Sequence, residues 1–247
     1  MKSTSEICFG IRAVEETIKA AKEIEKVFIK NGLRGELFNK LFVTIKELNI
    51  PFQFVPVEKL NRITRKNHQG IIAFISPVIF CNIENLVPQV YEKGEVPLFL
   101  ILDSISDVRN FGAIVRTAEC AAVNGIIIST KGSAQINSDS MKTSAGALNN
   151  MPICKSNNLK TTISFLKNCG IQICAATEKS DKIIYSADFN LPLAIIMGAE
   201  DKGIKKELLD LSDMLVKIPI FGNIESLNVS VAAGIILYEV LRQRNVN

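Results

Sequence analysis

The chain has 247 residues, of which 47% are hydrophobic and 22% charged, and this is long enough for two soluble domains with substantial cores. No apolar run reaches the roughly 18–20 residues that cross a bilayer, and the N-terminus leads into no signal-type segment, so we expect a cytoplasmic protein without a membrane partner. A net charge of +4, one histidine (His68) and six cysteines without a Cys-x-x-Cys pair argue against a zinc site and a Ser-His-Asp hydrolase. We predict no bound metal and interpret the cysteines as buried, reduced thiols.

The first third of the chain alternates predicted helices and strands. Helical patterns cover 11–20, 36–48 and 57–63, and apolar strand patterns cover 26–30, 51–55 and 70–75. This alternation predicts a small α/β domain over residues 1–78. Residues 79–96 contain Pro88 and Gly94 in a stretch of mixed polarity, and we interpret them as an interdomain linker.

The remaining residues, 97–247, contain apolar strand patterns separated by helical ones. The strands are predicted at 98–102, 125–129, 171–176, 193–197 and 215–220, and helices between them include 110–122 and 159–168. Such a sequence predicts a parallel sheet covered on both faces, with ligands bound beyond the carboxyl ends of its strands. The glycine fingerprints of dinucleotide-binding enzymes and of P-loop ATPases are missing from the sequence.

Positive charge is concentrated in the first domain. Residues 1–78 contain 13 Lys and Arg against 8 Asp and Glu, whereas the rest of the chain is nearly neutral. A basic and polar run over residues 62–69 precedes the strand at 70–75. This distribution is typical of a module that binds a polyanion, and chance together with solvated helix faces explains it equally well.

Two polar segments follow predicted strands of the second domain. In Asn110-x-Gly112-x-x-x-Arg116, Asn110 can begin a helix and Arg116 can offer a planar fork to phosphate oxygens. The alternative for Arg116 is a surface ion pair with Glu119 or Asp107. In Met197-Gly198-Ala199-Glu200, a glycine-containing turn suits a backbone pocket for a flat ligand, although such turns are common.

A third segment, Ser226-Leu227-Asn228-Val229-Ser230, opens a strongly apolar helix that runs to Arg244. So apolar a helix must be buried on more than one face. Capping by Ser226 or Asn228 accounts for one polar residue, but three are stacked here, and buried polar groups need partners.

Together, and in this order, the three segments closely resemble the SpoU (TrmH-type) RNA ribose 2′-O-methyltransferases. The N-terminal segments Gly10–Val14 and His68–Ala73 look like the substrate-binding extension of the 23S rRNA (guanosine-2′-O-)-methyltransferase subgroup, which resembles the ribosomal L30e/L7Ae fold. The resemblance therefore covers nearly the whole chain. One departure is Val108, where many relatives have a proline that would fix the turn before Asn110.

The resemblance implies an α/β fold with a C-terminal trefoil-knot (SPOUT) methyltransferase domain behind a small L30e/L7Ae-like N-terminal domain. It implies S-adenosyl-L-methionine as cofactor, bound largely by backbone groups. Mapped onto this sequence, the cofactor-binding residues are Gly198, Ala199, Ile218, Ile220, Leu227 and Asn228. The catalytic residues are Arg116, assisted by Asn110, Glu200, Ser226 and Asn228. Because a guanidinium stays protonated, we interpret Arg116 as gripping the adjacent phosphate and stabilising a developing alkoxide.

The resemblance also implies RNA as the partner, with 23S rRNA favoured and no DNA expected, and a homodimer. The predicted RNA-binding residues are Arg12, Arg62, Arg65, Lys66, His68 and Arg109. Two alternatives stay open: the same chemistry on tRNA, and a noncatalytic RNA-binding protein of the same fold.

Overall fold

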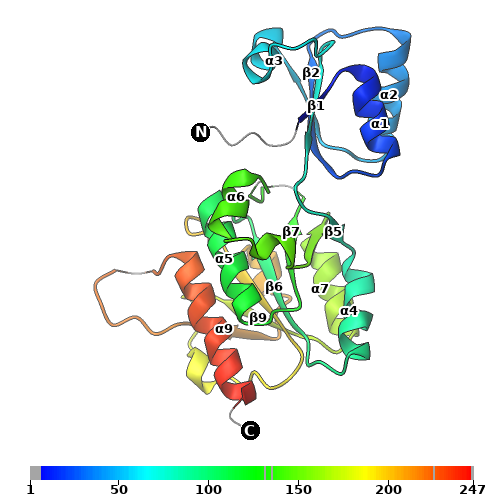
Figure 1. The fold of residues 1–247 in the computed structure, drawn as a ribbon. Coiled ribbons are helices and arrows are strands. Elements are labelled where there is room, and N and C mark those ends of the chain that lie inside the picture. Colours follow the sequence, from blue (N-terminus) through cyan, green and yellow to red (C-terminus); the bar gives the residue numbers. More distant parts are fainter. Residues whose placement is uncertain (1–6, 131, 135, 225, 246–247) are drawn as a thin grey trace. The chain divides into compact units, whose positions relative to one another are not determined.

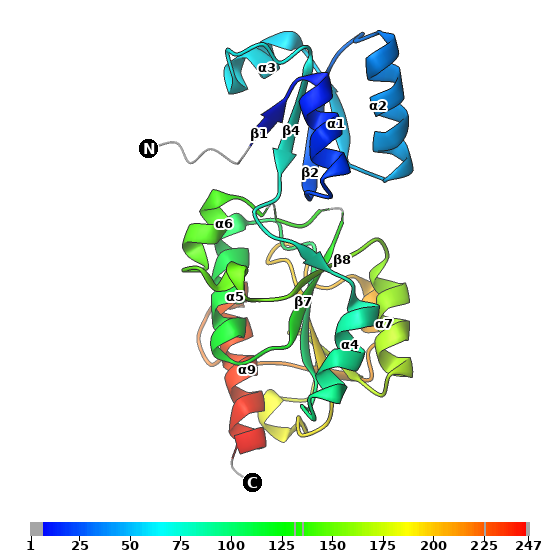
Figure 2. The same ribbon diagram turned by 45° about the vertical axis from the view of Figure 1, so that its right-hand side comes forward.

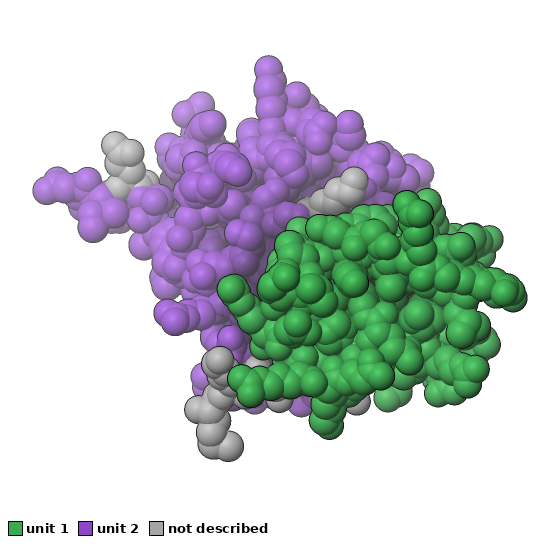
Figure 3. Space-filling model, turned by 90° about the horizontal axis from the view of Figure 1, so that it is seen from above, with its two compact units in different colours: residues 1–79, 136–138 green, residues 80–135, 139–247 purple. Residues whose placement is uncertain are grey.

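The computed structural model describes residues 7–130, 132–134, 136–224 and 226–245. The chain divides into two compact units at residue 79, and a short stretch, 136–138, groups with the first unit (Figure 3). None of the helices in the described ranges is long and apolar enough to cross a membrane. Each unit is a separate α/β body with its own core.

The N-terminal unit is a four-stranded sheet with helices on both faces. Its elements are β1 (Ile7–Phe9), α1 (Ile11–Lys19), β2 (Ile24–Lys30), α2 (Glu36–Glu47), β3 (Phe52–Val55), α3 (Val57–Ile63) and β4 (Ile71–Ile75). The strand order is β1-β4-β2-β3, with β4 antiparallel to both neighbours and β2 parallel to β3. Helices α1 and α2 cover one face, and α3 lies on the other (Figure 1).

The pleat of β2 explains why this small sheet has two cores. Val27 and Ile29 point into the cluster under α1 and α2, whereas Phe28 points into the cluster under α3. The α3 cluster has few fully buried members, Leu60 of α3 among them. The α3 face of the sheet is therefore only partly covered.

The C-terminal unit is built on a seven-stranded sheet in the order β11-β9-β10-β6-β7-β8-β5, and each neighbouring pair is parallel. Its strands are β5 (Phe80–Cys81), β6 (Leu98–Asp103), β7 (Gly125–Ser129), β8 (Ile153–Ser156), β9 (Gln172–Ala176), β10 (Leu193–Gly198) and β11 (Met214–Val216). Its helices are α4 (Ile83–Glu92), α5 (Val108–Cys120), α6 (Ser138–Thr143), α7 (Leu159–Asn168), α8 (Lys206–Leu209) and α9 (Val229–Asn245), with 3-10 turns at Ala147–Asn149 and Ile184–Ser186.

Helices α4 and α7 cover one face of this sheet, and α5 and α9 pack together on the other (Figure 2). All six residues of β6, at the centre, are buried. The predicted fold class, a covered parallel α/β sheet behind a small N-terminal α/β domain, is confirmed. Buried apolar strands favoured this architecture because both faces of such a strand need a covering layer.

The segment 79–96, expected as a linker, differs from that expectation. It contains β5, which pairs with β8, and α4, which Asn82 caps by accepting a hydrogen bond from the Glu84 N–H at 2.8 Å. Val87 and Val90 of α4 are buried in the main core. Pro88 suggested irregular chain, but the structure accommodates it inside the helix.

The cysteines are free, but their burial is uneven. Cys154 and Cys174 are buried, Cys120 is exposed, and the other three are intermediate. Burial raises the pKa of both Cys154 and Cys174 to about 12. The expectation of buried thiols therefore holds for only two of the six.

Candidate active site

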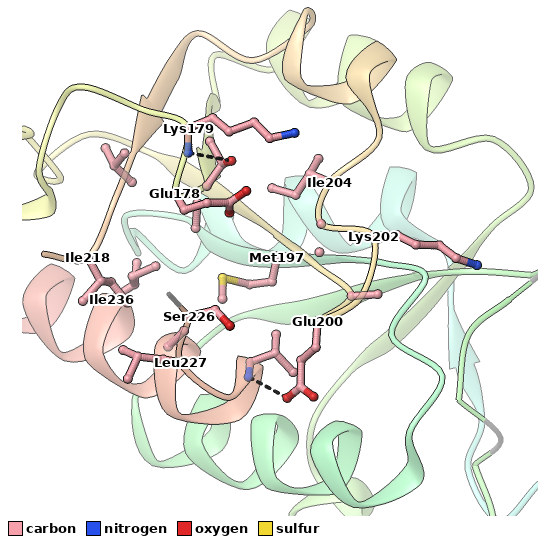
Figure 4. A pocket seen from close by; sticks show the side chains of 18 of the residues that line it. Glu178, Lys179, Met197, Glu200, Lys202, Ile204, Ile218, Ser226, Leu227 and Ile236 are labelled. Atoms are coloured by element: carbon pink, nitrogen blue, oxygen red, sulfur yellow. Dashed lines mark hydrogen bonds between the residues drawn. The ribbon is translucent and has the colours of Figure 1, made fainter. Parts of the chain in front are cut away.

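A cavity of about 390 Å³ lies beyond the carboxyl ends of β9, β10 and β11. Residues that follow these strands, together with the start of α9, line it: Ala176–Lys179, Met197–Ile204, Val216, Ile218, Ile220, Ser226, Leu227, Val229, Ala232 and Ile236. Figure 4 shows their side chains around the hollow, with Met197, Leu227 and Ile236 contributing apolar surface. A parallel sheet leads to this result because its strand ends share one edge, where loops replace covering helices.

The turn after β10 forms part of the cavity wall and depends on Gly198. A Cβ atom at Gly198 would lie 2.3 Å from the carbonyl carbon of Gly203 and 2.5 Å from the backbone nitrogen of Ile204. The turn closes through a hydrogen bond from the Gly203 N–H to the Ala199 carbonyl at 2.7 Å, and Gly203 has a φ of +63°. Both glycines are therefore required by the backbone itself.

A buried carboxylate anchors the far end of that turn. Asp103, at the end of β6, is fully buried and accepts hydrogen bonds from the Lys205 backbone N–H at 3.0 Å and the Lys205 Nζ at 2.7 Å. Ser104 donates to the same carboxylate at 2.9 Å. An ionised group without water needs such partners, and here they fix residues 199–205 to the central strand.

Three of the predicted catalytic residues meet in one hydrogen-bond cluster. Glu200 Oε1 accepts from the Asn228 Nδ2 at 2.6 Å, the Asn110 Nδ2 at 3.2 Å and the Val229 backbone N–H at 3.1 Å (Figure 4 shows the last of these). Asn228 Nδ2 also donates to Asn110 Oδ1 at 3.0 Å. The cluster joins α5, the turn after β10 and the start of α9, segments that lie about a hundred residues apart in sequence.

Asn228 also caps α9. Its Oδ1 accepts from the Ser230 backbone N–H at 3.0 Å and from the Ser230 hydroxyl at 2.5 Å. The three stacked polar residues of the sequence therefore have separate positions: Asn228 and Ser230 form the cap, and Ser226 lines the cavity. α9 itself is less buried than expected, since Val231 and Tyr238 are exposed.

The start of α5 corrects one expectation from the sequence. The helix begins at Val108, and its N-cap is Asp107, which accepts from the backbone N–H groups of Arg109 and Asn110, both at 2.8 Å. Because Asp107 caps the helix, the Asn110 side chain is left to join Glu200 and Asn228. Gly112 is needed farther along α5, where a Cβ would lie 2.7 Å from Thr143 Cβ.

Arg116 lies on an exposed part of α5. Among the residues that the structure describes it forms no ion pair, so neither Glu119 nor Asp107 neutralises it. A guanidinium in this state is available to an anionic ligand.

Five of the six predicted cofactor-binding residues line the cavity: Gly198, Ala199, Ile218, Ile220 and Leu227. The sixth, Asn228, hydrogen-bonds to the lining residue Glu200. The sequence interpretation missed Thr177, Glu178 and Lys179, which follow β9 and line the same cavity. The rule that ligands bind at strand ends was sufficient to find them, because the strand before them was predicted.

The predicted RNA-binding residues differ in exposure. Arg12, Arg62, Arg65 and Lys66 are exposed on the N-terminal unit, and Arg109 is exposed at the start of α5. His68 is buried instead, because both ring nitrogens are used internally. Its Nδ1 accepts from the Gly70 N–H at 3.0 Å, and its Nε2 lies 2.9 Å from Asn61 Oδ1. His68 therefore shapes the turn before β4.

The fold and the cavity define a parallel α/β protein whose ligand site is assembled from strand-end loops and the first turn of its C-terminal helix. The chain belongs to the SpoU rRNA Methylase family, whose model matches residues 97–238. Residues 7–80 match a second model, RNA 2'-O ribose methyltransferase substrate binding. The chain is thus an RNA methyltransferase of the SpoU or TrmH type, and the predicted family is confirmed.

Relatives and solved structures agree with this assignment. The chain is 32% identical over 246 residues to a Bacillus subtilis protein described as a TrmH family tRNA/rRNA methyltransferase, covering 99% of this chain and 98% of the relative. A Staphylococcus aureus protein of the same description is 34% identical over 97% of this chain and 96% of its own length. The fold matches the SpoU methyltransferase AviRb of Streptomyces viridochromogenes with a TM-score of 0.63 at 20% identity, over 98% of this chain and 91% of the other.

Proposed function

We propose that this chain transfers the methyl group of S-adenosyl-L-methionine to a ribose 2′-oxygen of ribosomal RNA, with a guanosine of 23S rRNA as the target. The observation that carries the proposal is the Asn110–Glu200–Asn228 cluster on the wall of the cavity, with the unpaired Arg116 on the same helix as Asn110. Together these residues offer a ligand cavity, an ordered polar wall and a free cation.

The cavity fits S-adenosylmethionine in size and in chemistry. Its volume of about 390 Å³ lies within the roughly 300–1,000 Å³ of small-ligand sites. Apolar side chains such as Ile218 and Leu227 suit a flat adenine ring, and Glu178 and Glu200 suit the cationic sulfonium and ammonium groups. AviRb and the rRNA methyltransferase from Sinorhizobium meliloti have each been solved with AdoMet bound. When bound, the cofactor supplies an electrophilic methyl group on a good leaving group.

The residues of the chain would then position the ribose and stabilise charge. A guanidinium does not give up its proton near neutral pH, so Arg116 acts by its charge and not as a base. We infer that it holds the phosphate next to the target ribose and stabilises the oxygen as the 2′-proton leaves. Asn110, Glu200 and Asn228, tied to one another, keep α5 and the cavity wall in register, and Ser226 faces the ligand from the start of the α9 segment.

Ribosomal RNA is favoured over tRNA by the extent of the similarity. A solved tRNA-modifying TrmH/SpoU enzyme from A. aeolicus covers 66% of this chain at 31% identity and a TM-score of 0.56. The rRNA methyltransferase from Sinorhizobium meliloti covers 96% of this chain at 23% identity and a TM-score of 0.62. The N-terminal unit, with its excess of positive charge, is the part that a compact tRNA enzyme lacks. A tRNA substrate is the second candidate, because the curated relatives are described as tRNA/rRNA methyltransferases.

We also propose a homodimer that involves the C-terminal segment. Phe221 and Ile224, between β11 and α9, are 96% and 77% exposed, and Val231 and Tyr238 of α9 are exposed as well. An apolar surface of this extent is typical of a protein interface. Light scattering at micromolar concentration tests the proposal, and a monomer would contradict it.

The function is tested with purified protein and labelled S-adenosylmethionine, offered 23S rRNA, 16S rRNA or tRNA, each naked and in ribosomal subunits where they exist. We expect label in 23S rRNA at a position that resists alkaline cleavage, since a 2′-O-methyl group blocks that cleavage. Arg116→Ala should abolish transfer while calorimetry finds nearly unchanged cofactor affinity, and Lys93→Ala on α4 serves as a charge-matched control. Label confined to tRNA would favour the second candidate, and activity retained in Arg116→Ala would refute the role of Arg116.

A further inference from the structure

The α3 face of the N-terminal sheet combines aromatic rings with lysines. Phe9, Phe28 and Phe74, from β1, β2 and β4, lie on this face, and the Phe28 and Phe74 rings meet edge to face with centroids 5.1 Å apart. Phe9 and Phe74 are only half-buried. The face is partly open because α3 is short and covers it mainly through Leu60 and Ile63.

Each of these rings has an ammonium group close to it. Lys59 Nζ lies 4.5 Å from the Phe28 centroid, Lys26 Nζ lies 5.0 Å from the Phe74 centroid, and Lys66 Nζ lies 6.0 Å from the Phe9 centroid. These distances fall within the range of cation–π attraction. The lysines are thereby held over the sheet, where their charge remains accessible.

Two further cations extend this surface. Lys30 lies two and four residues beyond Phe28 and Lys26 on the same strand, so the pleat places it on the same face. Arg62 is one helical turn from Lys59 on α3 and is exposed. We call this set, Lys26, Lys30, Lys59, Arg62 and Lys66 with the three phenylalanines, the α3 surface.

The charge of the α3 surface is not neutralised by the described residues. On the opposite face, Lys19 pairs with Glu15 at 2.6 Å and Lys40 pairs with Glu36 at 2.8 Å. By contrast, Lys59 and Arg62 have no ion pair with a described residue, although Glu58 is on the same helix. The two faces of the sheet therefore differ in net charge more than the sequence suggests.

We propose that the α3 surface binds a single-stranded segment of the RNA substrate. The inference rests on the proposed function for the presence of an RNA substrate, and it specifies where and in what form the N-terminal unit holds that RNA. Lysines and Arg62 contact phosphates, and unpaired bases stack on the half-buried rings of Phe9 and Phe74. Bases inside a duplex have no free face for such stacking, which is why a loop or a single strand fits this surface. Arg12, on α1, belongs to the opposite layer and lies outside it.

The test measures binding of a fluorescein-labelled oligouridylate to the full chain by anisotropy over a series of salt concentrations. Lys59→Ala/Arg62→Ala removes two charges from the α3 surface, and Lys40→Ala/Lys46→Ala removes two charges from α2 as the matched control. Each lost contact to a single strand lowers the slope of log K against log salt by about 0.7, so we expect a decrease of about 1.4 for the first variant. The control should keep the slope of the unmodified chain.

Stacking is tested separately with Phe74→Leu, which keeps an apolar side chain but removes the ring. Affinity for oligouridylate should fall roughly tenfold, with melting curves confirming that the variant folds. Equal affinity for a labelled RNA duplex would overturn the single-strand assignment. Unchanged slope and affinity in Lys59→Ala/Arg62→Ala would overturn the α3 surface even if the chain methylates rRNA. If the expected losses occur but no RNA accepts a methyl group, the binding surface stands and the proposed function fails.

Discussion

Replacing Gly198 with alanine tests whether the turn after β10 must have its observed shape. The added Cβ would lie 2.3 Å from the Gly203 carbonyl carbon and 2.5 Å from the Gly203 oxygen. Favourable contacts between such atoms lie near 3.5–4.0 Å, so the turn has to move by about an ångström. Both partners are backbone atoms, and Asp103 holds the following residue, Lys205, through two hydrogen bonds. The strain therefore cannot be relieved by rotating a side chain.

Overpacking of this kind costs about 1–3 kcal/mol, and the fixed backbone places Gly198→Ala near the upper end. At roughly 2–4 °C per kcal/mol for a domain of this size, the melting temperature should fall by about 6–12 °C. The effect on catalysis should be larger, because the turn carries Glu200 and lines the cavity. A displacement of about 1 Å can lower the rate about 100-fold.

Differential scanning fluorimetry and calorimetric titration with S-adenosylmethionine measure the two effects. Gly222→Ala is the matched control, because a Cβ there meets nothing within 4 Å and its φ is not positive. If Gly198→Ala melted and bound cofactor like the Gly222→Ala control, the close approach of the turn would not be a constraint, and the argument would be refuted.

Three further changes test other contacts. Asn228→Ala removes the α9 cap and the bonds to Glu200 and Asn110, so stability should fall by about 1 kcal/mol and kcat/KM far more, as melting and methyl-transfer assays would report; a loss of stability alone would make the residue a cap only. Arg244 donates to four backbone carbonyls, and Arg244→Met should cost about 2–4 kcal/mol in urea denaturation, against little change in Lys93→Met; equal midpoints would contradict this. The pKa of the thiols Cys154 and Cys174 is about 12 when folded, above the unfolded value, so their contribution is present below about pH 8.5 and is lost as pH rises toward 12, by up to about 1.4 kcal/mol per pH unit for each thiol. Alanine at both positions should make the alkaline loss of stability less steep, and an unchanged slope would argue against buried, protonated thiols.

The sequence was sufficient for the elements whose apolar pattern is long and regular. Residues 98–102, 125–129 and 193–197 read as buried strands, and each lies in the central part of the sheet. The pattern failed for β1, β5 and β8, which have four residues or fewer, because so short a run carries too little periodicity. It also failed for α4, where Pro88 suggested irregular chain although the burial of Val87 and Val90 stabilises the helix.

The candidate site followed a similar division. The motif order pointed to Asn110, Glu200 and Asn228, but nothing in their spacing showed that one carboxylate oxygen would join both amides. Asp103 was missed as an anchor because a lone aspartate after a strand is common. Its significance depends on Lys205, a residue about a hundred positions away.

What the sequence alone determined is the class of the fold, the family and the residues near which the chemistry takes place, because buried strands and short motifs are local patterns. Only the tertiary structure decided which of those residues are in contact. It removed His68 from the exposed surface by using both ring nitrogens internally, and it left Arg116 without a described ion-pair partner. It also divided the basic residues of the N-terminal unit between two faces. The physical reason is that pairing, burial and charge neutralisation depend on distances between atoms far apart in the chain, and those distances are fixed only when the sheets and helices pack.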